Sequence, residues 1–325
     1  PTLLGKRVIA ALTVGSLASH VVADSDLCIP LPSSMTAEEG ASFTTAFLTA
    51  LYGLITLADL KSGEVVLINS AAGGVGQAAL QIAQRRGARV LATASTPKHS
   101  FLLKQGIEAV YDSRTIDFAD QVLAHTNGRG VDVVINSLKG EWVDASFRSI
   151  AKGGRFLELG KIDIWSKEEA LKHRPDVTYL PFDLLEVAVA HPIVLRRLFF
   201  QLTKDLEEGS LKHLPLEVWP LEKCEDAFRH MAQARHIGKV VINQPKKGEP
   251  ISIDSHATYL VTGALGGIGL ELLPWLVQKG ARSLILVGRS VETPGLKGLE
   301  VLSDLENKGV KCLRINYDLS TKVID

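Results

Sequence analysis

Short apolar runs alternate with amphipathic segments of helical length along the middle of the chain. Arg89–Ala94, Val131–Asn136 and Arg155–Leu159 have the length and apolar content of buried strands, and a segment long enough for a helix separates each from the next. Strands that alternate with helices pair in parallel, because each crossover returns the chain to the same end of the sheet. The pattern therefore predicts a doubly wound parallel α/β sheet.

Shorter extended segments are expected before and after this region. These strands are predicted at Arg7–Leu12, Ala18–Ala23, Leu216–Trp219 and Lys239–Ile242. A crossing loop is expected at Ile29–Pro32, where two prolines interrupt the pattern, and a helix at Lys223–Gln233. We interpret the four strands as candidates for one small β-rich domain.

Two segments share one organisation, a strand that runs into a glycine-rich turn and a helix. The first, Val65–Gly76, has the pattern A-x-G-x-x-G, and the second, Tyr259–Gly269, has the pattern T-G-x-x-G-x-G. Glycines let the backbone approach a pyrophosphate, and the N-terminus of the following helix attracts its negative charge. Two nucleotide sites of the Rossmann type are therefore predicted, formed by Ala71, Gly73, Gly74, Val75 and Gly76 and by Gly263, Gly267 and Gly269.

The strand after the first turn ends without the acidic residue that binds the ribose hydroxyls of NAD. Ser95 and Lys98 follow it instead, and Arg114 comes after the next helix. A hydroxyl and two cations suit a 2′-phosphate, which accepts charge-assisted hydrogen bonds. We therefore expect NADPH rather than NADH, with the alternative that Lys98 simply opens a surface helix.

Comparable groups follow the second turn. Its next predicted strand, Ser283–Val287, is followed by Gly288 and then Arg289, where a 2′-phosphate would lie. Asp318 comes after a third predicted strand and suits a contact with adenine. This segment is therefore expected to form the beginning of a second Rossmann unit.

Composition narrows the class of protein. A chain of 325 residues with 46% hydrophobic and 22% charged residues is typical of two or three globular α/β domains. Its 36 basic and 36 acidic side chains cancel without clustering, so nucleic acid is not an expected partner. Three widely spaced cysteines favour a reducing cytoplasm over a disulfide framework or metal knuckle. No apolar run is expected to reach the roughly 20 residues needed to span a membrane, and a start without Met suggests a fragment of a longer polypeptide.

Several strings closely resemble the enoylreductase domains of polyketide and fatty acid synthases, in the zinc-free branch of the medium-chain reductases. The likeness runs in order over residues 5–245, and it is carried by Leu67–Gly76, Gly130–Leu138, Gly154–Lys161 and Met231–Val241. It implies reduction of a carrier-bound trans-2-enoyl thioester, with hydride passing from NADPH to the β-carbon and a proton to the α-carbon. It also implies that no metal takes part and that the front of a small GroES-like substrate domain is missing here.

The resemblance assigns roles to particular side chains. Lys161 matches the family's lysine, where a cation stabilises the developing enolate, and Asp183 matches its acidic partner in proton delivery. A solvated loop lysine and a helix-capping aspartate are the alternatives. His236 and Lys239 match the segment that reaches the nicotinamide end, and Ser137 and Leu138 are expected near it. The further residues expected to contact the cofactor are Asn136, Gly160 and Gly238.

The second glycine turn resembles the start of a ketoreductase of the short-chain type. An enoylreductase followed by a ketoreductase is the order in modular synthases, so an acyl carrier protein and other synthase domains are the expected partners. The predicted domains are 1–43 and 191–245 for the GroES-like part, 44–190 for the NADPH-binding Rossmann domain, 246–256 for a linker and 257–325 for the ketoreductase. The alternatives are a free-standing quinone or enal reductase, a cyclopropane-forming variant and an inactive NADPH-binding fragment.

Overall fold

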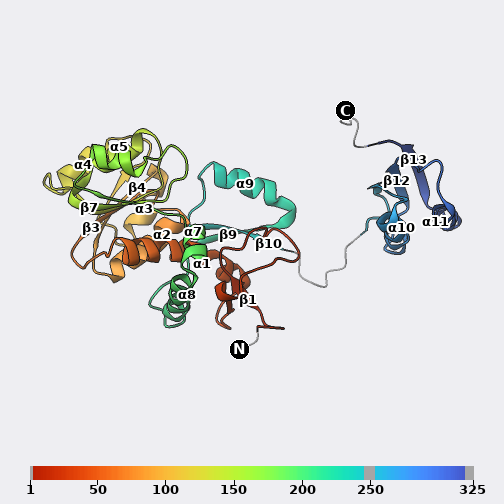
Figure 1. The fold of residues 1–325 in the computed structure, drawn as a ribbon, viewed down its shortest axis with the longest axis horizontal. Helices are drawn as coiled ribbons and strands as arrows, with labels where there is room; N and C mark the ends of the chain where they lie inside the picture. The colour runs from red at the N-terminus through yellow and green to blue at the C-terminus, as the bar shows by residue number, and fades with distance from the viewer. Residues whose placement is uncertain (1–2, 245–252, 319–325) are drawn as a thin grey trace. The chain divides into compact units, whose positions relative to one another are not determined.

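The computed structural model describes residues 3–244 and 253–318 (Figure 1). The chain divides into two compact units, Pro1–Pro245 and Lys246–Asp325. The linker predicted at residues 246–256 lies largely outside the described residues, because only its last four positions are among them.

Unit 1 is built on one six-stranded sheet in which all neighbouring strands are parallel, in the order β5-β4-β3-β6-β7-β8. The strands are β3 Val65–Ile68, β4 Arg89–Ala94, β5 Ala109–Asp112, β6 Val131–Asn136, β7 Ile150–Glu158 and β8 Thr178–Pro181. The order reverses direction at β3, as in a doubly wound sheet, so the predicted fold class is confirmed. The strands predicted at Arg89–Ala94 and Val131–Asn136 have the predicted bounds.

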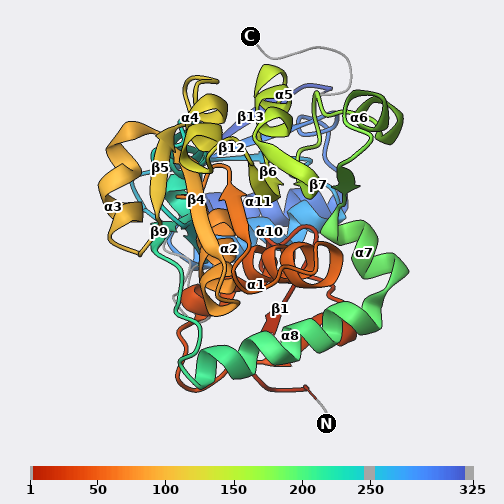
Figure 2. The same cartoon turned by 90° about the vertical axis from the view of Figure 1, so that its left-hand side faces the viewer.

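Helices cover both faces of this sheet, as Figures 1 and 2 show. Val66 and Ile68 of β3 pack into one core with α1 and α2, whereas Val65 and Leu67 pack into a second core with α4 and α5. Successive side chains of a strand point to opposite faces, which is why a continuous apolar run is needed here. The helices of this unit are α1 Ala37–Leu51, α2 Gly74–Arg85, α3 His99–Leu103, α4 Phe118–His125, α5 Glu141–Arg148, α6 Lys167–His173, α7 Leu184–Ala190, α8 Pro192–Glu207 and α9 Cys224–Ala232.

The first helix is long and apolar. α1 continues without a break into a π-helix, η2 Tyr52–Leu57, and together they are long and apolar enough to cross a membrane. The expectation that no run reaches that length was therefore wrong. Phe43, Phe47 and Leu48 of α1 are completely buried against the sheet and α8, so the apolar surface of this helix belongs to the core.

The flanking strands form two separate sheets in the described residues. β1 Val8–Ala10 pairs antiparallel with β2 Cys28–Pro30, and β9 Leu216–Pro220 pairs parallel with β10 Lys239–Asn243. The predicted single β-rich domain is thus not seen as one sheet. Short 3-10 helices lie beside these strands, η1 Ser25–Leu27 and η4 Leu221–Lys223, and a third, η3 Thr96–Lys98, follows β4.

Two predictions in the N-terminal part were wrong. Residues 18–20 form bends and residues 21–23 are irregular, with mostly exposed side chains, because no strand in the described part of the chain pairs with them. The crossing loop predicted at Ile29–Pro32 begins two residues late, since Ile29 and Pro30 pair with β1. Proline is tolerated there because β2 has a partner on one side in this small sheet.

Unit 2 has a three-stranded parallel sheet in the order β11-β12-β13. Its strands are β11 Thr258–Thr262, β12 Ser283–Gly288 and β13 Lys311–Asn316, and its helices are α10 Gly267–Gln278 and α11 Leu296–Asn307. Leu273, Leu286 and Leu305 lie in its core. The alternation of strand and helix agrees with the predicted start of a second Rossmann unit.

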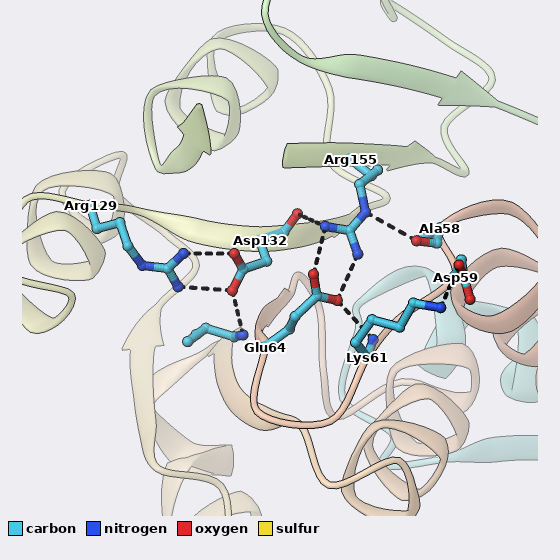
Figure 3. A network of polar contacts seen from close by, with 8 residues as sticks. Ala58, Asp59, Lys61, Glu64, Arg129, Asp132 and Arg155 are labelled. Atoms are coloured by element: carbon cyan, nitrogen blue, oxygen red, sulfur yellow. Dashed lines mark hydrogen bonds and ion pairs between the residues drawn. The ribbon is translucent and has the colours of Figure 1, made fainter. Parts of the chain in front are cut away.

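Charged side chains join the strands of unit 1 near their amino ends (Figure 3). Arg155 of β7 donates to both carboxylate oxygens of Glu64, at 2.9 and 2.7 Å, and to the carbonyl of Ala58. Asp132 of β6 accepts from Arg129 and from the backbone N–H of Val65. This cluster joins the strands at the amino end of the sheet, opposite to the end that holds the glycine turn.

Candidate active site

The first glycine turn links β3 to α2 with little space between them. Ser70 has a left-handed backbone, with φ of 53°, and Gly73 caps the helix that begins at Gly74. A Cβ on Gly76 would lie 2.5 Å from the Cα of Ala71, which is completely buried. Glycine is therefore required at position 76 for the helix to pack against the turn.

A segment from the end of unit 1 lies directly on this turn. The N–H of Gly238 donates to the carbonyl of Ala72 at 2.8 Å, and Gly238 also forms a parallel bridge with Gly73. Gly238 has φ of 76°, and a Cβ there would overlap the carbonyl of Pro215. The alkyl chain of Lys239 packs beside Gly74, and burial lowers the pKa of its ammonium group. Gly238 and Lys239, both predicted site residues, thus contact the backbone of the glycine turn.

One cavity of about 340 Å³ lies on the β4 side of the turn and is lined by cationic and polar groups. Ser95, Lys98, Arg114 and His236 all contribute to its wall. The Lys98 ammonium donates to the carbonyls of Ala234 and His236, at 2.8 and 2.6 Å. Burial, and then the charge of Arg114, lower the pKa of Lys98. Lys98 therefore faces the cavity and its rim, rather than opening a surface helix alone.

A second cavity of about 550 Å³ lies on the β6 and β7 side of the turn. Lys161 and Asp183 line it, and their side chains form an ion pair with Nζ and Oδ2 2.5 Å apart. Asp183 also caps α7, because its Oδ1 accepts from the N–H of Leu185. The hydrogen bond from Lys161, followed by that from Leu185, lowers the pKa of Asp183. Asp183 therefore both pairs with Lys161 and caps α7, and its part in proton delivery stays a prediction.

The two cavities meet at the glycine turn. Ser70 and Gly73 line both of them, and Val75 and Gly76 also line the larger one. An elongated ligand that crosses the turn would therefore place one end beside Lys98 and Arg114 and the other beside Lys161 and Asp183. The cationic cavity, the exposed helix N-terminus and the glycines together fit a phosphorylated dinucleotide.

Some predicted contacts are divided differently from the expectation. His236 lies in the cavity with Lys98, whereas we expected it near the end that Lys161 occupies. Ser137 lines the cavity of Lys161, but its neighbour Leu138 lines the other one. Asn136 is completely buried behind both. Closeness in sequence did not reveal this division, because the glycine turn separates the two cavities and neighbouring residues can line different ones.

Glu158 is the functional candidate that the sequence reasoning missed. It ends β7, is completely buried, and accepts hydrogen bonds from Asn136 and from the N–H of Gly160. Burial raises its pKa to about 7. The signal was an acidic residue between Leu157 and Leu159 in a predicted buried strand, where a charge needs a specific reason.

The second glycine turn, in unit 2, also links a strand closely to the helix that follows it. Gly263 has φ of 61°, Gly267 begins α10, and a Cβ on Gly269 would overlap the carbonyl of Ala264. Arg289 is exposed after β12, and Asp318 is half-buried after β13. The contacts of Arg289 and Asp318 with a cofactor stay predictions. In the described residues both side chains lie in the segments that follow strands of the sheet.

Within residues 3–244 and 253–318, no group of three or more His, Cys, Asp or Glu side chains is placed to hold a metal ion. The family described as zinc-binding dehydrogenase nevertheless matches residues 105–242. The described side chains do not provide the ligand set that a zinc site needs. We therefore derive no step of the chemistry through zinc.

A second family match and a curated relative cover the rest of the chain. The KR domain family matches residues 257–323. Pikromycin polyketide synthase component PikAII of Streptomyces venezuelae is 41% identical over 309 residues, which are 94% of this chain. The chain spans 8% of the length of that relative.

Solved structures resemble unit 1 in fold and sequence. CurK enoyl reductase is 48% identical with a TM-score of 0.66, and the match covers 68% of this chain and 66% of that one. The CurF ER cyclopropanase from the curacin A biosynthetic pathway is 44% identical with a TM-score of 0.67, covering 69% and 68%. Mycobacterial Rv1454c complexed with NADPH is 26% identical with a TM-score of 0.67, covering 73% and 75%.

These matches agree with the geometry of unit 1 and with the second glycine turn. The enoyl reductase match covers 68% of this chain, and the KR match begins one residue before β11. The chain therefore belongs to the enoyl reductases of polyketide synthases and continues into the start of a KR domain.

Proposed function

We propose that unit 1 catalyses the NADPH-dependent reduction of a carrier-bound trans-2-enoyl thioester to the saturated acyl thioester. The observation that carries this proposal is the glycine turn between a cation-lined cavity and the cavity of Lys161 and Asp183. The acyl chain would be tethered to an acyl carrier protein, and other synthase domains would supply it. We place this activity in the cytoplasm, the compartment we expect for the chain.

NADPH would be held by Ser95, Lys98 and Arg114 at its 2′-phosphate and by the glycine turn at its pyrophosphate. When bound, it supplies the hydride that adds to the β-carbon. The CurK and Rv1454c resemblances support this choice, because one is an enoyl reductase and the other is complexed with NADPH. The cationic groups around Lys98 favour a phosphate over the free hydroxyl of NADH.

Lys161 would act where charge develops during the reaction. Addition of hydride to the β-carbon leaves negative charge on the thioester oxygen and α-carbon, and an ammonium group stabilises that charge. A proton from Lys161 then completes the α-carbon, and the Asp183 carboxylate holds the lysine in place through their ion pair. The exposed side chain of Lys161 lets it recover a proton from solvent.

The test compares Lys161→Ala with Lys167→Ala, an exposed lysine at the start of α6 that does not line the cavity. A crotonyl thioester of pantetheine is the substrate, and loss of NADPH absorbance is measured. The assay uses the chain itself and the chain preceded by the reductase residues that the family resemblance implies.

Lys161→Ala should lower kcat by about tenfold to a hundredfold, while the Kd for NADPH changes by less than about threefold. Asp183→Asn should act in the same direction but less strongly, and Lys167→Ala should have no effect. Full turnover in Lys161→Ala with none in Asp183→Asn would show that these roles are wrong. If neither substitution mattered, the proton would come from solvent or from another part of the synthase.

A cyclopropane-forming reaction is the second candidate, because the CurF ER cyclopropanase is 44% identical. In that reaction hydride addition drives displacement of a halide instead of protonation at the α-carbon. A γ-chloro enoyl thioester distinguishes the two, since chloride release with a cyclopropyl product supports cyclisation and a saturated chloroacyl thioester supports simple reduction.

A further inference from the structure

Buried polar side chains form a continuous row beneath the active site. Thr93, Asn69, Asn136 and Glu158 lie at or just beyond the carboxyl ends of β4, β3, β6 and β7, which are neighbours in the sheet. None of the four is more than 3% exposed. Polar groups removed from water in this way must form hydrogen bonds with one another. A buried polar group without such a bond lowers the stability of the fold.

Donors and acceptors in this row run in one direction. The Thr93 hydroxyl donates to Oδ1 of Asn69 at 3.0 Å, and Nδ2 of Asn69 donates to Oδ1 of Asn136 at 3.0 Å. Nδ2 of Asn136 then donates to Oε2 of Glu158 at 2.8 Å. Nδ2 of Asn69 also donates to the Ser146 hydroxyl oxygen at 2.9 Å. The amide group of Asn69 therefore cannot rotate without losing hydrogen bonds.

The row ends at the loop that carries Lys161. The N–H of Gly160 donates to Oε1 of Glu158 at 2.7 Å. A Cβ on Gly160 would lie 2.8 Å from that same oxygen, so the backbone approaches the carboxylate as closely as only glycine permits. Lys161 is the next residue, and it reaches from this loop to Asp183.

At the other end, the row reaches the glycine turn. The N–H of Ser70 donates to the Thr93 hydroxyl at 3.3 Å, and the N–H of Ala71 donates to the Thr93 carbonyl at 3.0 Å. Ser70 lines both cavities. The turn and the Lys161 loop are therefore connected by side chains rather than by the backbone alone.

Ionised Glu158 accepts the hydrogen bonds seen in the row, whereas its burial favours the protonated form. Both of its oxygens accept from N–H donors, and within the described residues it forms no ion pair. Burial, and then the charge of Glu158, raise the pKa of Tyr179 on β8, whose hydroxyl donates to the carbonyl of Trp165. A proton on Glu158 would therefore meet donors on both sides, and the bond to Gly160 or to Asn136 would be lost.

We propose that Glu158 is a positioning residue for Lys161: its carboxylate fixes the Gly160 amide, and the row through Asn136, Asn69 and Thr93 sets this loop relative to the glycine turn. This inference rests on the proposed function, in which Lys161 acts on the substrate. Because burial raises the pKa of Glu158 to about 7, we expect the hydrogen bond from Gly160 to Glu158 to respond to pH near neutrality.

The first test follows the backbone amide of Gly160 by nuclear magnetic resonance in the full chain, with no cofactor or substrate present. Its chemical shift should titrate with a midpoint near pH 7 in the unsubstituted chain and should not titrate in Glu158→Gln. Asp205→Asn is the matched control, because Asp205 is an equally buried carboxylate that pairs with Arg85 away from this loop. A flat Gly160 shift in the unsubstituted chain overturns the proposal, even if Glu158→Gln fails to fold.

The second test measures enoyl-thioester reduction as a function of pH. Glu158→Gln should lower kcat by about tenfold and remove the ionisation near pH 7 from its pH profile, while the Kd for NADPH changes by less than about threefold. Glu158→Asp should recover part of the rate and retain an ionisation. An unchanged pH profile in Glu158→Gln, or an equal loss in Asp205→Asn, argues against a positioning role.

The two proposals fail in different ways. If the unsubstituted chain reduces no enoyl thioester but Gly160 titrates, the proposed function is wrong and the coupling of Glu158 to the loop stands. If reduction occurs and depends on Lys161 but Gly160 does not titrate, the function stands and the role of Glu158 is rejected.

Discussion

Cofactor selection depends on single side chains around Lys98. Its ammonium group bonds the carbonyls of Ala234 and His236 and lines the same cavity as Ser95 and Arg114. We predict that the chain binds NADPH at least about tenfold more tightly than NADH, because a tenfold preference needs only about 1.4 kcal/mol from a charged contact. Titration of each cofactor by nicotinamide fluorescence measures the preference.

Substitution of this lysine should change the preference rather than binding in general. Lys98→Ala should raise the Kd for NADPH much more than that for NADH, and Lys104→Ala should change neither, since Lys104 lies at the end of α3 outside this cavity. Equal affinities for the two cofactors, or an unchanged preference in Lys98→Ala, would show that Lys98 does not bind the 2′-phosphate of NADPH.

The contact between Lys161 and Asp183 was anticipated from the family resemblance, whereas the burial of Glu158 was not. Lys161 and Asp183 are 22 positions apart, and only the resemblance suggested that they act together before the structure brought them into contact. Glu158 stands within the quoted string Gly154–Lys161, yet nothing in its spacing indicated a role. Its importance arises from burial beside Asn136, which is a property of the folded sheet.

At the scale of elements, the junction of β3 with α2 decides whether the site forms. A Cβ on Gly76 would lie 2.5 Å from the Cα of Ala71, whereas on Gly73 it would meet only the Ser70 carbonyl at 3.4 Å. We predict that Gly76→Ala lowers the free energy of unfolding by about 1 to 3 kcal/mol, because helix and turn must separate. Urea unfolding followed by tryptophan fluorescence measures the loss.

Gly73→Ala is the matched control within the same turn. It should unfold at nearly the same urea concentration as the unsubstituted chain but should bind NADPH more weakly, because its new methyl group faces the two cavities. The interpretation of the turn is incorrect if the two variants lose stability to the same extent.

Elements with a strong periodic signal were predicted well, and isolated ones were not. β4 and β6 have the predicted bounds because each is an apolar run enclosed by sheet and helices. Val21 and Val22 are also β-branched, but residues 18–23 have no partner strand among the described residues, so the same local signal gives an irregular segment. A strand requires a neighbour, and sequence composition does not supply one.

For the whole of unit 1, the cluster in Figure 3 joins segments that are far apart in sequence. Arg155 and Glu64 are both about one-fifth exposed, so loss of one partner leaves a poorly solvated charge. We predict that Arg155→Met lowers the free energy of unfolding by about 1 to 3 kcal/mol. Urea unfolding of the purified chain measures it.

Arg148→Met serves as the comparison, because Arg148 pairs with Asp120 and Asp144 on an exposed surface. Its effect should stay below about 0.5 kcal/mol, as is usual for exposed ion pairs. If both variants lost the same stability, the location of Arg155 between β3, β6 and the end of η2 would have no special importance.

Stability should also depend on pH through Glu158. Its pKa is raised by burial from 4.5 to about 7, so the folded chain binds this proton more tightly than the unfolded chain. The contribution of Glu158 to stability is therefore fully present below pH 4.5 and is lost as the pH rises through about 7.

Relative to Glu158→Gln, the unsubstituted chain should lose up to about 1.4 kcal/mol per pH unit across that interval and no more above it. Urea unfolding of both proteins at a series of pH values gives the two curves. Parallel curves would mean that Glu158 has an ordinary pKa in the folded chain.

The sequence by itself determined the parallel α/β class, the two glycine turns and the family, because periodicity and short motifs are local properties of the chain. It also supplied the side chains for the site, including Lys161, Asp183 and Lys98. The tertiary structure decided which of them meet. The glycine turn separates the site into two cavities, and four neighbouring strands bring Glu158 beneath the Lys161 loop. Burial and hydrogen-bond partners come from strand order and packing, which no local segment of the sequence specifies.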